Sequence, residues 1–469
     1  MRFSAVETAE QWLSAPLLDR VRPFARKIDT IRAGADETAV AQRMSLIAFA
    51  IRVASAGIIF LSQALIARWT GTFNYGVYVF VWTAIIILGG LSCLGFQTAV
   101  VRFLPGYRKN GDLERLRGII RTSRLFVLAS ATLVTVIGMA AIWLLADRIE
   151  SYYVLPFLLA FICLPMLAME DVLESTARAN QWPVRALAPA FLVRPSLTLI
   201  YVAAIHLLGY EASAEAALIA AVLATYTTTL LQLVMVNRGL AATYPPGARQ
   251  SELKEWMTVA FPIFLVEGFF FLLTNADVLM VGFFRPPDEV GVYFATVKIL
   301  ALVHFVFFAV KSGVSQQFAA YTEPEDRATL RVFARQTVGW TFWPSLVIGV
   351  AVLVFGEFLL SLFGAEFSAG YPLLFVLIAG VLVRAAVGPA ESLLNMTGNQ
   401  NVCATIFAIV LVVNVVLNLV LIPAHGLMGA AVATALATFI EAALLFLITW
   451  RRIGVAMFVL APQPKAEAA

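Results

Sequence analysis

The segment NADVLMVGFFRPPDEVGVYFAT, from Asn275 to Thr296, places a short charged turn between two apolar runs. The turn, RPPDE, begins at Arg285, and the apolar residues extend well beyond the quoted segment on both sides. An apolar run of about 20 residues is long enough to cross a bilayer as a helix. The segment therefore predicts two membrane-spanning helices joined by a loop of a few residues.

Twelve such runs fill most of the 469-residue chain, which is 61% hydrophobic and 13% charged. Soluble domains carry about 25% charged residues. A chain in lipid must satisfy its own backbone hydrogen bonds, so the runs predict helices, and the alternating pattern of a transmembrane barrel is absent from the sequence. We expect an all-α polytopic membrane protein with spans at about 45–68, 76–103, 124–146, 150–173, 187–209, 213–236, 257–284, 291–318, 337–363, 372–397, 400–422 and 427–450.

Lys and Arg residues lie mostly on one side of these predicted spans. Outside the spans, 24 fall on the side of the two termini and 3 on the other side. Cytoplasmic loops carry such an excess of positive charge, so both termini are predicted to be cytoplasmic. The net charge of +4 reflects this bias and does not predict a nucleic-acid partner.

Residue types that carry catalysis or bind metals are sparse and scattered. The sequence has no P-loop, no HExxH and no GxGxxG motif. Its first apolar run begins at Ser45 and is too long for a cleavable signal. We therefore predict no catalytic residue, no metal site and no bound cofactor. The isolated residues behind this prediction are Cys93, Cys163, Cys403, His206, His304 and His425.

The first 44 residues form a basic tail with a helical apolar stripe. Five basic residues are interspersed between Leu13 and Arg32, among apolar residues spaced three or four apart. This pattern predicts a segment that lies on anionic membrane lipids. The alternative is a basic tail that only fixes the topology, and the sequence favours neither.

An internal repeat divides the chain. The tripeptide GVY occurs at residues 76–78 and again 215 positions later, and an Asn-Gln pair recurs after 219 positions. The repeat predicts two six-helix halves of the same orientation, with a binding site at the interface between them. The expected organisation is a tail (1–44), a first bundle (45–236), a cytoplasmic linker (237–256), a second bundle (257–452) and a tail (453–469).

Six cationic residues lie inside the predicted spans, where charge is costly and usually faces a cavity or a partner. They predict a cationic, anion-binding lumen. For the last three in the list, the alternative is a long side chain that reaches the membrane surface. The six residues are Arg52, Arg194, Arg384, Arg102, Lys298 and Lys311.

Carboxylates inside the spans gather in the second half, at Glu267, Asp277, Glu391 and Glu441. The first three are candidates to hold a coupling H+ or Na+ or to pair with a cation. For Asp277 the alternative is a local structural role near the membrane edge.

Specific charge pairs follow from the spacing. Arg384 and Glu391 would lie about 10.5 Å apart along a continuous helix, too far for a direct bond unless both side chains bend. Arg52 matches Glu267 at the 215-residue offset, which suggests an opposite-charge pair. Glu174 and Arg178 are four residues apart and predict a structural pair near the membrane surface.

Several segments resemble one family of transporters. ARWTGTFNYGVYVF (Ala67–Phe80) resembles the first outer-loop signature of polysaccharide-type members of the multidrug/oligosaccharidyl-lipid/polysaccharide (MOP) superfamily. Other segments resemble their second span, their seventh and eighth spans, and the hairpin before the last span. These are LGFQTAVVRF (Leu94–Phe103), the opening segment quoted above, and LIPAHGLMGAAVAT (Leu421–Thr434).

The resemblance implies two six-helix bundles around a central cavity. It also implies a flippase in the bacterial inner membrane that moves undecaprenyl-diphosphate-linked oligosaccharides by alternating access, for exopolysaccharide or O-antigen synthesis. The implied partners are this lipid-linked substrate, a polysaccharide polymerase and export machinery.

Other functions remain as alternatives. Within the superfamily they are a cation-coupled multidrug exporter and a lipid II flippase. The first half has no carboxylate deep in a predicted span, which argues against the exporter. Predicted outer loops of about ten residues or fewer argue against a membrane glycosyltransferase or polymerase, so we expect a transporter and not an enzyme.

Overall fold

The computed structural model describes residues 37–320 and 327–461, which are helical for most of their length and contain no strand. The predicted basic tail lies almost entirely outside these residues. The helices are α3 (Glu37–Ser92), α4 (Phe96–Lys109), α5 (Leu113–Leu144), α6 (Ser151–Phe161), α7 (Leu164–Ala179), α8 (Pro183–Ala188), α9 (Arg194–Leu207), α10 (Ala214–Thr243), α11 (Leu253–Phe284), α12 (Pro287–Ala320), α13 (Arg327–Ser361), α14 (Tyr371–Ala385), α15 (Ala390–Met396) and α16 (Gln400–Ile448).

Two of these helices fold back on themselves at a glycine. Gly71 in α3 has φ +76°, a conformation that glycine adopts readily. The Tyr75 hydroxyl then lies 3.0 Å from Gln63 Oε1. Residues twelve apart in a continuous helix would be about 18 Å apart, so the chain reverses between them. Gly426 has φ +57° and marks the same kind of break in α16.

The twelve predicted passes are confirmed. Within residues 37–320 and 327–461, eight helical stretches are long and apolar enough to cross a membrane, and the bent pair α6 and α7 adds a ninth. Because α3 and α16 each reverse at their glycine, each supplies two passes. Helix α11, 32 residues long, supplies the remaining one.

Some spans are broken in ways that the sequence did not predict. The second span is interrupted at residues 93–95, where Gly95 packs against the Ala260 carbonyl group of α11 and leaves no room for a side chain. The tenth span is interrupted between α14 and α15, where Gly388 has φ +62°. Within the linker predicted at 237–256, residues 244–252 lie between α10 and α11.

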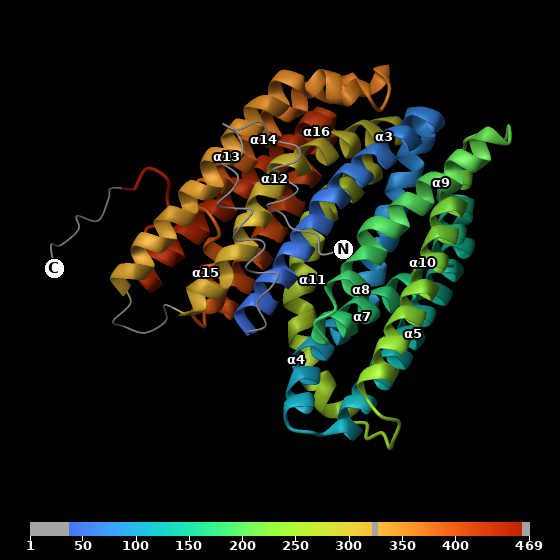
Figure 1. Ribbon diagram of the computed structural model, residues 1–469. Helices are drawn as coiled ribbons and strands as arrows, with labels where there is room; N and C mark the ends of the chain where they lie inside the picture. Colours follow the sequence, from blue (N-terminus) through green and yellow to red (C-terminus); the bar gives the residue numbers. More distant parts are fainter. Residues whose placement is uncertain (1–36, 321–326, 462–469) are drawn as a thin grey trace, which may run out of the picture.

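The helices form two groups (Figure 1). Helices α5 to α10 lie on one side and α13 to α16 on the other, with parts of α3, α11 and α12 between them. Helix α3 packs against α9 of the first half and against α12 of the second half. This is the two-bundle layout expected from the repeat. The residue bounds of the two bundles remain a prediction.

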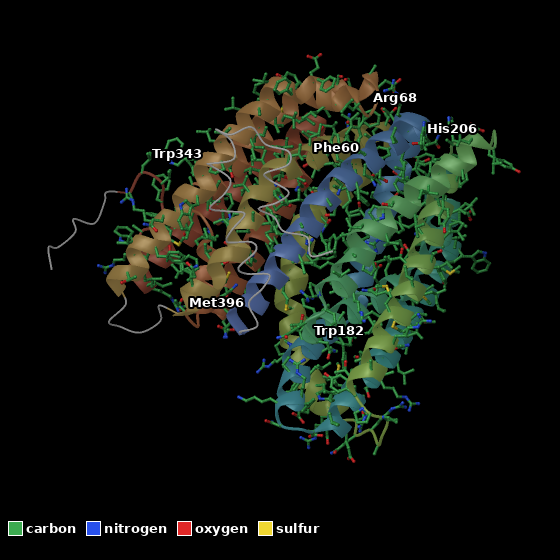
Figure 2. The ribbon with its side chains drawn as sticks, in the orientation of Figure 1. Phe60, Arg68, Trp182, His206, Trp343 and Met396 are labelled. Carbon is green, nitrogen blue, oxygen red and sulfur yellow. The ribbon has the colours of Figure 1, made fainter. Side chains whose placement is uncertain are left out.

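The molecule has two distinct ends (Figure 2). Arg68 and His206 lie at one end, where His206 stacks on Trp69 at 5.4 Å, and we call it the GVY end. Trp182 and Met396 lie toward the other end. We call this the basic end, and it includes residues 108–112, 180–182, 244–252 and 397–399.

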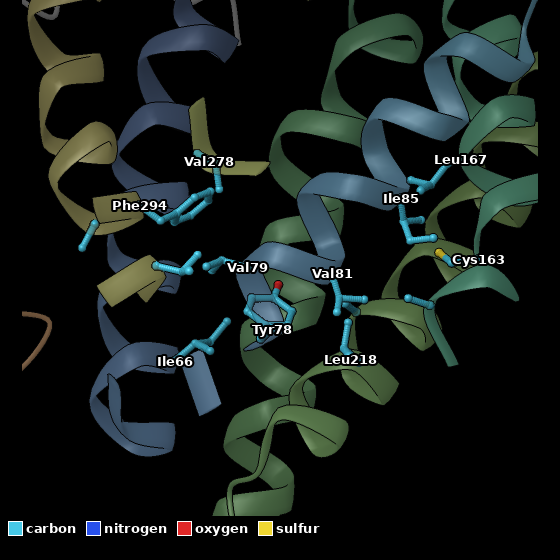
Figure 3. Packing of buried hydrophobic residues seen from close by; sticks show 14 of the residues in the cluster. Ile66, Tyr78, Val79, Val81, Ile85, Cys163, Leu167, Leu218, Val278 and Phe294 are labelled. Carbon is cyan, nitrogen blue, oxygen red and sulfur yellow. The ribbon is translucent and has the colours of Figure 1, made fainter. Parts of the chain in front are cut away.

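The two GVY copies pack on each other at the GVY end. A β-carbon on Gly76 would overlap the Pro287 carbonyl oxygen, and one on Gly291 would lie 2.8 Å from the Thr72 carbonyl oxygen. Thr72 and Pro287 are 215 positions apart, as are the two glycines. The two contacts are therefore equivalent under exchange of the halves, which gives the sequence repeat a structural counterpart. The surrounding core includes Tyr78, Val278 and Phe294 (Figure 3).

Candidate functional site

A cavity of about 610 Å3 lies between the two halves, nearer to the basic end than to the GVY end. The first half contributes residues of α3, α4, α7 and α9, and the second half residues of α11, α12, α15 and α16. The lining residues are Ile86, Gly90, Leu91, Gln97, Leu167, Asp171, Glu174, Ser175, Arg178, Arg194, Phe264, Gly268, Phe271, Lys311, Glu391, Asn395 and Phe407.

The GVY end of the interface is closed by direct contacts between the halves. Besides the paired glycines, Thr72 Oγ1 donates a hydrogen bond of 2.9 Å to Glu366 Oε2. The buried Tyr75 ring packs edge-on against Phe294 and Phe367, with centroids 6.1 and 5.7 Å away. The halves are thus in contact at this end and enclose the cavity nearer to the other end.

Helix α7 supplies most of the polar wall in the first half. Asp171, Glu174, Ser175 and Arg178 follow a helical spacing and therefore share one face. The Arg178 side chain is 57% exposed, and its Nη2 lies 3.7 Å from Glu174 Oε1. The predicted pair near the membrane surface is formed, and it also faces the cavity.

Arg194 is the first residue of α9, and Arg52 lies on α3. Arg194 Nη1 donates to Glu170 Oε2 at 2.7 Å, and this carboxylate is almost fully buried. Arg52 lies outside the cavity lining, with its guanidinium 3.7 Å from the centre of the Phe191 ring. The predicted partner of Arg52, Glu267, lies on α11, but its side chain is not among those that the structure describes.

The second half holds a buried cluster of four charges. Arg384 donates through Nε to Glu441 Oε1 at 2.7 Å, through Nη2 to Glu391 Oε2, and through Nη1 to the Gly388 carbonyl at 2.7 Å. Lys311 Nζ lies 3.2 Å from the other oxygen of Glu391. Two cations and two carboxylates leave this charge cluster without net charge.

The direct bond between Arg384 and Glu391 corrects the distance expected from the sequence. That expectation assumed one continuous helix through residues 372–397. The chain instead leaves the helix after Ala385 and starts a new one at Ala390. The break at Gly388 brings the two side chains together, and Arg384 also bonds the carbonyl group of this glycine.

The other candidate residues lie outside the cavity. Arg102 is exposed on α4, and Lys298 Nζ lies 4.4 Å from the centre of the Phe294 ring on α12. Asp277 is 6% exposed and accepts hydrogen bonds from the Val278 backbone N–H at 2.9 Å and from the Tyr293 hydroxyl at 3.0 Å. Of the carboxylates predicted to hold a coupling ion, Glu391 alone is among the described lining residues.

The charges of the described lining balance. Arg178, Arg194 and Lys311 face Asp171, Glu174 and Glu391, so the described lining has no net charge, whereas the sequence suggested an excess of cations. The first half also supplies carboxylates to the cavity, contrary to expectation. Sequence reasoning missed Asp171, Arg178 and Gln97 as lining residues. The helical spacing of the charged residues on α7 was the signal that could have identified the first two.

Comparisons with known families agree with this architecture. The profile of a family described as "Polysaccharide biosynthesis protein" matches residues 43–315, more than half of the chain. The MatE profile matches residues 262–420. The two profiles together cover both halves of the interface around the cavity.

A curated relative and solved structures are also similar. The probable low-salt glycan biosynthesis flippase Agl15 of Haloferax volcanii is 28% identical over 179 residues, 36% of each chain, so the match spans about a third of the relative's length. An inward-facing MATE family transporter of the MOP superfamily has a TM-score of 0.69 and 14% identity, with coverage of 87% of this chain and 98% of the other. A MOP superfamily transporter from Pyrococcus furiosus has a TM-score of 0.65 and 15% identity, with coverage of 91% and 97%.

Proposed function

Since the chain belongs to the polysaccharide biosynthesis protein family and has the fold of MOP superfamily transporters, we propose that it is a flippase for a lipid-linked oligosaccharide. The substrate is an oligosaccharide joined through a diphosphate to a polyprenyl lipid such as undecaprenol. The observation that carries the proposal is the cavity between the halves, to which both halves contribute cations and neutral polar groups.

The lining supplies the chemistry that such a substrate requires. A diphosphate that leaves water needs charge-assisted hydrogen bonds, which Arg178, Arg194 and Lys311 can donate from both sides of the interface. Sugar hydroxyls need neutral partners. Gln97 Oε1 is buried without a hydrogen-bond partner in the described protein, and Asn395 faces the same space. Both can bond sugar hydroxyl groups.

The proposed transport cycle is alternating access. We assign the basic end to the cytoplasm on the positive-inside rule. In this proposed orientation the cavity lies toward the cytoplasmic side, and the GVY contacts close the periplasmic side. Transport then requires the contacts of Gly76, Gly291 and Tyr75 to separate while the halves close at the basic end. The proposed location is the inner membrane of a bacterium.

A second candidate is the export of amphipathic cations. Asp171 and Glu174 in the first half of the cavity favour it, since they can attract a cationic ligand. Arg178 and Arg194 on the same wall favour the anionic substrate instead, because a guanidinium can donate two hydrogen bonds to a phosphate.

Reconstitution distinguishes the two functions. Liposomes with the protein should move a polyprenyl-diphosphate oligosaccharide between leaflets, scored by a glycosidase added outside. Parallel liposomes are assayed for uptake of tetraphenylphosphonium. Leaflet exchange no faster than in protein-free liposomes would refute the flippase, and tetraphenylphosphonium transport would support the exporter.

A further inference from the structure

A second cavity of about 730 Å3 lies at the basic end, away from the interface between the halves. It is lined by α5, α10 and the segment 244–252 (Figure 1). The lining residues are Leu116, Arg117, Ile120, Arg121, Arg124, Leu125, Asn237, Leu240, Ala241, Tyr244, Pro245, Pro246, Gly247 and Arg249. Four of them are arginines and none is a carboxylate, unlike the balanced lining of the central cavity.

The arginines share one face of α5. Arg117, Arg121 and Arg124 are spaced four and three residues apart, which aligns them on the side that faces the cavity. Arg249 approaches from the segment opposite. No carboxylate of the described lining offsets these four positive charges, so an anion or solvent must compensate them.

Arg124 has donors left over for a ligand. Its Nη1 donates to Asn237 Oδ1 at 2.7 Å, while its Nε and Nη2 are buried without a partner in the described protein. Leaving a buried donor without a partner is unfavourable, so these atoms favour an acceptor from a ligand. The nearby carboxylates Asp112 and Glu252 are paired with Arg115, which does not line the cavity.

Hydrogen bonds from α5 hold the segment 244–252, which forms one wall of this cavity. Arg117 donates to the carbonyl groups of Pro245 and Ala248 at 3.0 and 3.2 Å. The Gln250 N–H donates to the Glu114 carbonyl at 3.1 Å. A β-carbon on Gly118 would overlap the Gln250 carbonyl oxygen, so the segment rests directly on α5. The cavity is thus a built feature of the fold.

The cavity lies where the apolar surface of the protein begins. Leu125 is 55% exposed, and exposed apolar residues continue along α5 through Leu133 to Leu144. On α10 the exposed Val234 is followed by the cavity residue Asn237. The arginines therefore sit at the depth of lipid headgroups, and an apolar surface for acyl chains starts beside them. A basic pocket between helices at this depth suits an anionic headgroup.

We propose that this cavity binds the phosphate group of an anionic membrane lipid, with Arg121, Arg124 and Arg249 as its ligands. Arg124 supplies its unpartnered nitrogens Nε and Nη2 as donors, and the lipid chains lie along Leu125. The phosphate group is the chemistry recognised, and the exposed leucines favour a lipid over free phosphate as its source. The proposal does not depend on the transported substrate.

Lipid binding can be measured by native mass spectrometry of the delipidated, detergent-purified protein titrated with phosphatidylglycerol. Arg121→Gln/Arg124→Gln should weaken this binding about tenfold, the loss expected when charge-assisted hydrogen bonds are removed. The matched control Arg108→Gln/Lys109→Gln removes the same charge from exposed residues at the same end and should keep the wild-type affinity. Equal weakening in both double variants, or none in the first, would overturn the site.

Two further arms complete the test. Arg249→Glu changes an exposed residue of the segment 244–252 and should weaken phosphatidylglycerol binding by several fold even if the first double variant fails to fold. Unchanged binding in a folded Arg249→Glu protein would count against the site. Phosphatidylcholine and inorganic phosphate should not compete at the concentrations at which phosphatidylglycerol saturates. Competition by inorganic phosphate would overturn the assignment to a lipid.

Discussion

Replacing Arg384 by alanine should lower the stability of the folded protein. We expect this effect because the side chain holds buried charges together and does not line the cavity. The residue is 8% exposed, and its side chain joins two carboxylates within the buried charge cluster. After the substitution Glu391 keeps Lys311 as its partner, 3.2 Å away. Glu441 loses the ion pair that Arg384 provides. Breaking a buried ion pair by removing one partner costs about 3–5 kcal/mol, so we expect a loss of that size.

A second substitution tests whether the unpaired Glu441 carboxylate causes the loss of stability. Glu441→Gln in the Arg384→Ala background removes the unpaired carboxylate and restores neutrality to the cluster. What remains is lost packing and an unpaired Gly388 carbonyl group, which costs roughly 1–3 kcal/mol. The double variant should therefore be more stable than Arg384→Ala alone, by about 2 kcal/mol.

The assay is the thermal midpoint of the purified protein in detergent, measured by the monodisperse fraction left after heating. Arg384→Ala should lower the midpoint clearly, Arg384→Ala/Glu441→Gln should recover part of it, and Arg102→Ala, at an exposed position on α4, should leave it unchanged. A wild-type midpoint for Arg384→Ala, with leaflet exchange lost, would refute the structural role. Such a result would instead support the predicted role of Arg384 in substrate binding.

Three other predictions address the topology, Asp277 and the tail. Single cysteines at Asp288 and Arg249 should label from opposite sides of the membrane, with Asp288 periplasmic, since the three native cysteines are buried; labelling of both from outside would contradict the topology. Tyr293→Phe removes the hydroxyl that bonds Asp277 Oδ2 and should cost about 1–3 kcal/mol, visible as a lower thermal midpoint. A peptide of residues 12–32 should gain helicity on anionic vesicles and be released by salt, and equal binding to neutral vesicles would leave the tail with its topological role alone.

The spans were predictable because one physical requirement governs them. Each pass needs about 20 apolar residues whatever its neighbours are, so a span can be recognised from the local sequence alone. The breaks at Gly95 and Gly388 depend on tertiary contacts. Gly95 approaches the Ala260 carbonyl on α11, and Gly388 contacts Val338 on α13. Partners so distant in the chain are not visible in a hydropathy pattern.

The candidate site was predictable in location but not in charge balance. The repeat indicated a cavity between the halves, and Arg194, Lys311 and Glu391 of the predicted set do line it. Arg384 is absent from the lining because a chain break turns it toward two carboxylates. Arg178 was assigned to the membrane surface because it lies near the end of its span, although the space between the halves extends to that depth.

The balance of charge in the cavity constrains how an anionic substrate can bind. Arg194 is held by Glu170 at 2.7 Å and Lys311 by Glu391 at 3.2 Å, so a diphosphate must compete with carboxylates already in place. Arg178 is different, since its ion pair is 3.7 Å long and more than half of its side chain is exposed. Exposed ion pairs contribute little free energy. Replacing Glu174 by a phosphate as the partner of Arg178 therefore costs less than the same exchange at Arg194 or Lys311. Within the proposed function, Arg178 is therefore the cation that meets the diphosphate first, and the tighter pairs exchange only as the halves move.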